Sequence, residues 1–461
     1  MHAAPKQNDF SKGSIPGTIL HLSGPLVVAQ IINILYSVVD RMYIGQMPEV
    51  GRLALTGIGV TMPVISIITG FANLCGMGGA PLCSIARGAG DKDRAEHIMG
   101  NSFTLLLLFA ALLTAVGLVF RRPLLYFFGA SDAVYPYASA YASIYLLGTV
   151  MAMVTVGMNP FINLQGFTRT GMTTTILGAV INIVLDPLFI FVLHMGIRGA
   201  AVATVIAQTC SALWVLRFLT GKRAILTLKL KNLRLKADYV SRILSLGLAG
   251  FMMSITNSLV QTVCNKTLLA HGGDLYVSCM TIISSVRELA FAWVNGMTAG
   301  AGPFLSFNYG AGTYERVRKG IVFMTGITAA CSLAMTSIIL LFPGQLIHIF
   351  NRDPSFIAIC TPAMRLYFCM FTFMSLQMSG QTVFQNLNRP KSAVFFSLLR
   401  KAALVTPLTI LLPGLFGLGV NGVFIAEPIS NVIGGIACFV TMLLTIYIPL
   451  GRKSQAKEVR P

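Results

Sequence analysis

The sequence predicts an all-α integral membrane protein, with twelve transmembrane helices in two six-helix lobes related by a pseudo-two-fold axis along the membrane normal. Three observations predict it: the composition, the number of long apolar stretches and an internal repeat. Hydrophobic residues make up 55% of the 461 and charged residues only 11%. A soluble domain carries about 25% charged residues, because its surface faces water. A soluble globule of this length is therefore excluded.

Twelve apolar stretches are each long enough to cross a bilayer, which takes about 20 residues of helix. The first is long and lacks a small-x-small cleavage site, so we interpret it as a span and not as a cleaved signal. We expect spans at 15–40, 53–80, 97–120, 134–160, 170–194, 199–220, 240–266, 275–303, 320–343, 355–386, 392–416 and 419–448.

The basic residues indicate an orientation. Lys and Arg gather in alternate connections, most densely between Arg217 and Arg242. Short cytoplasmic loops carry such an excess in membrane proteins. We therefore expect a multi-pass protein of the plasma membrane with a cytoplasmic N-terminus. The net charge of +19 follows from this topology and does not indicate nucleic-acid binding.

The repeat divides the chain at its one extended polar linker. We expect an N-lobe at 1–222 with helices 1–6 and a cation site, a cytoplasmic linker at 223–238, and a C-lobe at 239–461 with helices 7–12. The matches keep one order and a nearly constant offset of about 222 residues, as duplication would give. They pair Gly88-Ala89-Gly90 with Gly310-Ala311-Gly312, Asn73 with Asn295, Pro81 with Pro303, Asp186-Pro187-Leu188 with Thr406-Pro407-Leu408, and Gly196 and Gly199 with Gly419 and Gly422.

Four acidic residues fall inside the expected spans: Asp40, Asp186, Glu288 and Glu427. An ionisable side chain at the bilayer centre costs about 2.5–3.5 kcal/mol on insertion scales, and it usually faces a partner or water. These four are therefore the first candidates for function.

Asp40 stands near the outer end of the first span. Asn33 and Tyr36 precede it by seven and four residues, which places all three on one helix face. Pro25, earlier in the same span, interrupts the backbone hydrogen bonds and is a candidate bend point.

A second polar group comes from the fifth and sixth spans. Asn182 and Asp186 are four residues apart and share a face of the fifth span. Thr204 lies in the sixth span, which follows after a short connection. With Asp40 these residues offer oxygen ligands, which hard cations prefer. They predict a cation-binding site that could hold Na⁺, and they equally suit a proton shared between two close carboxylates. The alternative is that Asp40 lies at the outer interface and Asp186 caps a helix end before Pro187.

The second half lacks this pair of acids. Cys264 corresponds to Asp40, and Thr406 corresponds to Asp186. Its own intramembrane charges include the adjacent Arg287 and Glu288, and Arg400 and Glu427 in neighbouring spans. We interpret these either as structural ion pairs or as a second proton or substrate site at Glu288 and Glu427.

The order and spacing of these features resemble the multidrug and toxic compound extrusion (MATE) family over nearly the whole chain. The residues that carry the resemblance are Gly24-Pro25 followed by Asp40, the loop Gly88-Ala89-Gly90-Asp91 with Arg94, the run Asn182 to Asp186-Pro187, and Gly196 to Thr204. The resemblance implies a two-lobed antiporter that exchanges Na⁺ or H⁺ for organic, often cationic, drugs and contributes to antibiotic resistance. It implies coupling residues at Asp40, Asn182, Asp186 and Thr204.

Other classes of protein fit less well. The chain has no nucleotide-binding loop of the Gly-x-x-x-x-Gly-Lys type and no Gly-x-Gly-Asp stretch in a span, so we expect neither an ATPase nor an intramembrane aspartyl enzyme. A flippase for a lipid-linked or polysaccharide precursor on a related scaffold is the main alternative. We expect a monomer in the lipid bilayer that acts on small molecules, without a cofactor, a catalytic residue or a nucleic-acid partner.

Overall fold

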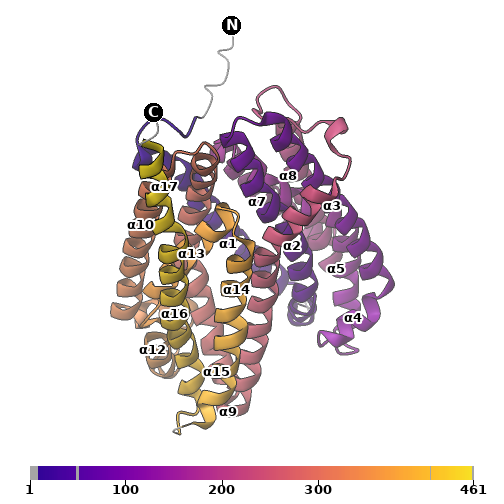
Figure 1. Ribbon diagram of the computed structural model, residues 1–461. Helices are drawn as coiled ribbons and strands as arrows, with labels where there is room; N and C mark the ends of the chain where they lie inside the picture. The colour runs from indigo at the N-terminus through magenta and orange to yellow at the C-terminus, as the bar shows by residue number, and fades with distance from the viewer. Residues whose placement is uncertain (1–8, 48–50, 416, 459–461) are drawn as a thin grey trace. The chain divides into compact units, whose positions relative to one another are not determined.

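The computed structural model describes residues 9–47, 51–415 and 417–458, and in these ranges the chain is helical with no strand. Ten helices are long and apolar enough to cross a membrane, and two bent pairs raise the number to twelve. Each expected span overlaps one of these helices or bent pairs over nearly its whole length. Residue 416, the expected end of the eleventh span, lies outside the described residues. The prediction of an all-helical membrane protein is therefore confirmed (Figure 1).

The helices of the first half end with the linker. They are α1 (Ile15–Gly45), α2 (Gly51–Gly88), α3 (Lys92–Val119), α4 (Arg121–Phe127), α5 (Tyr135–Leu147), α6 (Thr149–Asn163), α7 (Thr168–Pro187) with its π-helical continuation η1 (Leu188–Val192), α8 (Ile197–Leu219) and, in the linker, the single turn η2 (Leu230–Asn232).

The second half begins with α9 (Ala237–Gly310), which joins two spans across a break at Gly273. The remaining elements are α10 (Tyr314–Leu341), α11 (Pro343–Phe350), α12 (Pro354–Phe368), α13 (Thr372–Asn386), α14 (Pro390–Leu398), η3 (Leu399–Val405), α15 (Thr406–Leu411), η4 (Leu412–Gly414), α16 (Val420–Met442), η5 (Leu443–Tyr447) and α17 (Ile448–Glu458).

The repeat predicted from the sequence reappears in the backbone. The fourth span of each half is a bent pair, with 59° between α5 and α6 and 43° between α12 and α13. The fifth span of each half contains a π-helical segment, η1 or η3. The sixth begins at a glycine with the same unusual torsions, φ 55° and ψ −134° at Gly196 and φ 51° and ψ −131° at Gly419. The bent fourth spans and the glycines that begin the sixth spans therefore correspond in the two halves, whereas the π-helical segment follows Pro187 in one half and precedes the equivalent Pro407 in the other.

The chain forms two compact units. Val28–Ser254 builds most of unit 1, and Phe10–Val27 with the chain from Ile255 onward builds unit 2. The first part of α1 belongs to unit 2, where the Ser23 hydroxyl donates to the carbonyl of Met297 at 3.1 Å. The first part of α9 belongs to unit 1, where Asn73 donates to the Ser254 hydroxyl at 3.5 Å. The helices α1 and α9 therefore each contribute to both units.

Small residues let helices approach closely inside each unit. In unit 1 a side chain at Gly247 would collide with the backbone of Leu74, and one at Gly78 with the backbone of Ile243. In unit 2 a side chain at Gly300 would collide with Ser23. Gly78 and Gly300 are 222 residues apart, so the repeat includes this packing. Close backbone approach is a main source of helix association in a membrane, where lipid is as apolar as Leu.

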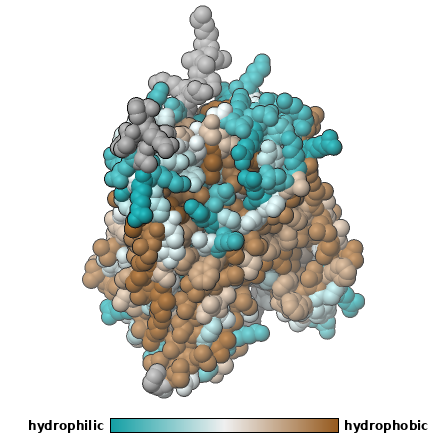
Figure 2. All heavy atoms as spheres, in the orientation of Figure 1, coloured by the Kyte–Doolittle hydropathy of each residue, from teal (hydrophilic) through white to brown (hydrophobic). Residues whose placement is uncertain are grey.

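Large apolar side chains remain exposed along the outer faces of the helices. On α7, Val180 and Val184 are exposed, whereas Asn182 and Asp186 on the same helix are buried. Figure 2 shows hydrophobic residues covering the long helices on the visible face, over α14 to α16 for example, with hydrophilic residues gathered toward one end. This inside-out distribution suits helices surrounded by lipid.

Polar groups on the first half bind the linker. The carboxylate of Glu96, which is 2% exposed, accepts a hydrogen bond from Lys229 Nζ at 2.6 Å and from the backbone N–H and hydroxyl of Thr227 at 3.3 and 3.2 Å. Asn101 accepts from the Lys236 N–H at 2.8 Å, and Gln165 accepts from the Leu226 N–H at 2.8 Å. The linker loops over the end of this unit where α3 begins (Figure 1). It is therefore a docked part of unit 1.

The two equivalent glycines give a test of the fold. Added Cβ atoms at Gly196 and Gly419 would meet almost no neighbour, so alanine there would cost only backbone strain. We expect Gly196→Ala and Gly419→Ala each to destabilise the protein by about 1–3 kcal/mol, measured by thermal unfolding in detergent. The control Gly326→Ala lies in open space within α10 at ordinary helical torsions, and it should stabilise by about 0.5–1 kcal/mol. Equal changes in stability at all three positions would show that backbone torsion is not what requires glycine at 196 and 419.

The linker gives a second test. Glu96→Ala removes the acceptor of three hydrogen bonds, and a buried unpaired donor costs about 1–3 kcal/mol. We expect trypsin to cut the linker about tenfold or more faster in this variant, because cleavage follows the population of the undocked form. The control Glu315→Ala removes a half-exposed carboxylate that pairs with Arg318 and Lys319 and makes no hydrogen bond to the linker among the described residues, so it should change the rate little. An unchanged cleavage rate in Glu96→Ala would show that the linker is held by other contacts.

Candidate functional site

Unit 1 contains a buried group of polar side chains from four helices, which we call the carboxylate cluster. Its members carry carboxylate, amide or hydroxyl oxygens: Tyr36 and Asp40 on α1, Tyr141 and Tyr145 on α5, Asn182 and Asp186 on α7, and Thr204 on α8. Five of the seven were predicted from the sequence. The helices that bring them together are far apart in the chain.

The backbone around Asp186 explains its position. Pro187 has no N–H, so the helical hydrogen-bond ladder is interrupted directly after Asp186, and the chain continues as the π-helical η1. Asp186 and Asn182 are 0% and 1% exposed. Asn182 Nδ2 donates to Asp186 Oδ1 and to Thr204 Oγ1, both at 3.3 Å, and the Thr204 hydroxyl donates to the carbonyl of Ala200 at 3.0 Å. Asn182 thus links α7 to α8.

Asp40 reaches the same place from α1. It is partly buried, and its carboxylate is close enough to Asp186 for the two side chains to interact directly. The Tyr36 side chain, one turn earlier, interacts electrostatically with both carboxylates. The two carboxyl groups are therefore neighbours. The alternative, in which Asp40 lies at the outer interface and Asp186 caps a helix end, stays a prediction.

Two further predicted residues of α1 have a different status. Asn33 lies on an exposed part of the helix, one turn before Tyr36. Pro25 lies in a helix that runs without a break from Ile15 to Gly45. The roles of Asn33 in the site and of Pro25 as a bend point stay predictions.

Three oxygen atoms of the carboxylate cluster are buried without a hydrogen-bond donor among the described residues: Asp40 Oδ1, Asp186 Oδ2 and Asn182 Oδ1. All three can only accept, and two belong to carboxylates. A buried acceptor without a donor is costly, more so when it is charged. Their chemistry fits a hard cation or a proton, which would supply the missing positive partner. Among the described residues no group of three or more His, Cys, Asp or Glu forms a transition-metal site.

Tyr141 and Tyr145 were not predicted. Both are buried, their rings stack with centroids 6.1 Å apart, and Tyr141 interacts with Thr204, Asp40 and Tyr36. The signal was available, because Tyr137, Tyr141 and Tyr145 recur every four residues in an apolar span. Three hydroxyls on one face of a membrane helix indicate a polar neighbour, which only the packing of α5 against α8 identifies.

Unit 2 contains a buried group of mostly basic side chains around one carboxylate, which we call the basic cluster. Glu427 on α16 accepts from Arg400 at 3.1 Å and from Lys401 at 3.1 Å, both on η3. Arg400 also donates to Asn431 Oδ1 at 2.6 Å, and Arg287 interacts with Glu427 and with the Tyr367 hydroxyl. The sequence predicted that Arg400 and Glu427 approach each other, and they do. Lys401 was not predicted.

Two other residues of unit 2 that the sequence singled out, Glu288 and Cys264, make no hydrogen bond to Glu427 among those of the described residues. Glu288 is exposed on α9 beside Arg287. Cys264, which corresponds to Asp40, lies 3.8 Å from the Thr409 hydroxyl. Unit 2 therefore has a thiol beside a hydroxyl where unit 1 has Asp40 beside Asp186, although Thr409 is not the counterpart of Asp186 in the repeat.

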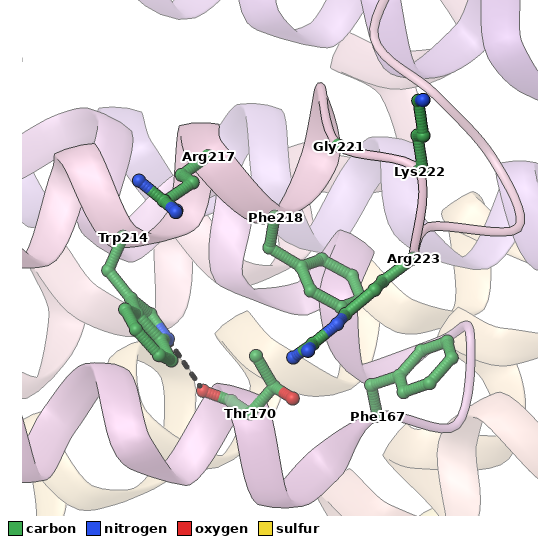
Figure 3. A pocket seen from close by; sticks show the side chains of 8 residues that line it. All are labelled: Phe167, Thr170, Trp214, Arg217, Phe218, Gly221, Lys222 and Arg223. Atoms are coloured by element: carbon green, nitrogen blue, oxygen red, sulfur yellow. Dashed lines mark hydrogen bonds between the residues drawn. The ribbon is translucent and has the colours of Figure 1, made fainter. Parts of the chain in front are cut away.

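A pocket of about 590 Å³ opens at the end of α8, and no residue of the carboxylate cluster lines it (Figure 3). Aromatic and basic side chains line it: Phe167, Thr170, Trp214, Arg217, Phe218, Lys222 and Arg223, with Gly221. The Trp214 ring N–H donates to the carbonyl of Thr170 at 3.4 Å. Arg217, Lys222 and Arg223 are exposed, as is usual for solvated side chains at the end of a membrane helix.

Comparison with known proteins identifies relatives along the whole chain. A family model described as MatE matches twice, at residues 25–188 and 250–411, once in each half. Multidrug export protein MepA of Staphylococcus saprophyticus is 22% identical over 95% of both chains, and the FAD transporter of Shewanella oneidensis is 25% identical over 91% of this chain and 93% of its own. The crystal structure of MATE in complex with MaL6 superposes with a TM-score of 0.91 at 23% identity, covering 97% of this chain and 99% of that one.

The proximity of Asp40 and Asp186 gives a test. In alkaline buffer without Na⁺, two neighbouring carboxylates repel each other, so Asp40→Asn and Asp186→Asn should each raise the thermal stability of the protein. Because either change removes the same repulsion, the double variant should gain less than the sum, with an interaction energy of about 0.5–3 kcal/mol. Thermal unfolding of all four proteins gives this value. Additive effects would mean that the carboxylates do not interact.

Proposed function

This chain belongs to the MatE family of membrane transporters, and we propose that it is a cation-coupled antiporter that exports small organic, often cationic, drugs by alternating access. It is a transporter and not an enzyme. The observation that carries the proposal is the buried pair Asp40 and Asp186, with acceptor oxygens that lack donors among the described residues. Charge of this kind inside a membrane protein marks the path of an ion.

We assign the coupling ion to the carboxylate cluster. Na⁺ or H⁺ enters between Asp40 and Asp186, and the oxygens of Asn182 and Thr204 complete its surroundings. The hydrogen bonds from Asn182 to Asp186 and Thr204 support this role, because they orient the amide before the ion arrives. Tyr36 and Tyr141 cover the ion from α1 and α5.

Ion binding acts on transport by shifting the populations of inward-facing and outward-facing states. It can shift them only by as much as its affinity differs between the two states. Helix α1 is suited to convey the difference, because Asp40 belongs to unit 1, whereas its first part, with Ser23, belongs to unit 2. Pro25 lies close to this division and is the proposed bend point.

The cargo assignment rests on the relatives. MepA is named a multidrug export protein, and its match covers 95% of this chain. The 22 Met residues of this chain are consistent with a binding surface that can repack around varied apolar molecules. We propose a monomer in the plasma membrane with a cytoplasmic N-terminus, and functional lobes at 1–222 and 239–461 joined by the linker at 223–238.

The proposal predicts the effect of neutralising each coupling carboxylate. In proteoliposomes, we expect Asp40→Asn and Asp186→Asn each to lower ion-driven efflux of a cationic drug about 5–150-fold, the usual range of coupling between two ligands. The control Asp132→Asn makes the same chemical change outside the spans, at a carboxylate bound by Tyr126, and should retain efflux. Separately imposed Na⁺ and pH gradients identify the ion. Wild-type efflux in both cluster variants would refute the assignment, and no drug efflux in the wild type would favour a lipid-precursor flippase.

A further inference from the structure

The basic cluster of unit 2 contains more cationic groups than its acids can neutralise. Arg287, Arg400 and Lys401 surround the single buried carboxylate of Glu427. Glu288 is the other acid near Arg287, and it is exposed. Even with Glu288 counted, three cations face two carboxylates. A structural ion pair in an apolar interior would be balanced, because unpaired charge there costs several kcal/mol.

The cluster also contains hydrogen-bond donors without acceptors. Arg400 Nε and Asn431 Nδ2 are buried and have no partner within the described ranges, although the two side chains are bonded to each other through Arg400 Nη1 and Asn431 Oδ1. Arg400 is 7% exposed and Asn431 is 0% exposed. Both oxygens of Glu427 already accept from Lys401, at 3.1 and 3.5 Å. Neither Arg400 Nε nor Asn431 Nδ2 reaches a Glu427 oxygen, so both donors are left for an acceptor from outside the cluster.

The backbone is arranged to build this group. Arg400 and Lys401 are adjacent in sequence, and adjacent side chains on an α-helix point about 100° apart. The π-helical η3 changes that spacing, and both side chains reach Glu427 on α16. Gly434 on α16 leaves room for the Arg400 stem, since a side chain there would lie 3.2 Å from Arg400 Cγ. Such π-helical segments occur frequently at functional sites.

Equivalent helices of the repeat contribute to the two clusters, and the charges of the two clusters are opposite. Gly196 and Gly419 begin equivalent helices 223 residues apart, and the same offset relates Thr204 to Glu427. Thr204 belongs to the cluster whose unsatisfied atoms are all acceptors. Glu427 belongs to the one whose unsatisfied atoms are donors. The duplicated scaffold thus carries sites of opposite polarity.

We propose that the basic cluster is a binding site for an oxyanion, a phosphate or carboxylate group, held by Arg400, Lys401 and Asn431 with Arg287 nearby. Guanidinium groups bind these planar or tetrahedral oxyanions through paired N–H donors, and the ammonium group of Lys401 adds a point charge. The oxyanion is either a free inorganic ion or the charged group of a small organic solute. Binding of an organic solute rests on the proposed transport function, and the site would then extend the cargo to anionic molecules. Binding of an inorganic ion does not depend on that function.

Binding to the purified protein in detergent tests the proposal without transport. The probes are inorganic phosphate, phenyl phosphate and the cation benzamidine, each compared with chloride at equal ionic strength. We expect both phosphates to raise the melting temperature and benzamidine to have no such effect. Tighter binding of phenyl phosphate indicates an organic solute, and equal binding indicates the inorganic ion. No stabilisation beyond chloride, or equal stabilisation by benzamidine, overturns the proposal.

Variants locate the binding in unit 2. Arg400→Gln should weaken phosphate binding about tenfold or more, because it removes a charged donor. Glu427→Gln keeps the side-chain shape and removes the competing carboxylate, so it should bind phosphate more tightly than the wild type. If Arg400→Gln fails to fold, phosphate binding by Glu427→Gln alone tests the proposal. Phosphate binding that is unchanged or weaker than in the wild type overturns it.

A further variant separates this proposal from the transport function. Asp40→Asn should lose drug efflux and keep phosphate binding, because Asp40 lies in unit 1. Loss of phosphate binding in Asp40→Asn would contradict a separate site in unit 2. Normal efflux in Asp40→Asn with phosphate binding intact would refute only the coupling role, so the two failures are distinguishable.

Discussion

Two carboxylates buried side by side repel each other and lose the water that would solvate them, and the rest of unit 1 is organised around that cost. Asp40 and Asp186 come from helices far apart in the chain, and one oxygen of each has no donor among the described residues. Asn182 donates to one oxygen of Asp186 and at the same time to the Thr204 hydroxyl. In our proposal a positive ion supplies the remaining partner, and the same electrostatic cost would then limit where that ion binds.

Irregular backbone occurs where polar groups are concentrated. A regular helix satisfies its own backbone hydrogen bonds, which is why helices can cross lipid. In the fifth span of each half the regular pattern is interrupted by a π-helical segment, after Asp186 in one half and around Arg400 and Lys401 in the other. Asn182, one turn before Asp186, donates to Thr204 on α8, and Lys401 on η3 donates to Glu427 on α16. Both halves have an irregular fifth span, although the π-helical segment follows Pro187 in the first half and precedes Pro407 in the second.

Close packing makes each unit a firm support for these groups. Glycines bring α2 against the first part of α9, and the second part of α9 against the first part of α1, backbone to backbone. Because α1 and α9 each contribute to both units, a change at Asp40 acts on a helix whose beginning is held elsewhere, by the contact of Ser23 with Met297. Rigid units connected through two shared helices are a suitable basis for switching between discrete states.

The sequence by itself determined the helical membrane fold, the twelve spans, the repeat and most of the carboxylate cluster, because apolar length and helical spacing are local properties of the chain. It even placed Arg400 near Glu427. Only the tertiary structure brought Tyr141 and Tyr145 to the carboxylates, joined Lys401 to Glu427 and docked the linker on Glu96. These contacts depend on which helices pack together and on how far a π-helical segment rotates a side chain, and no local pattern records either.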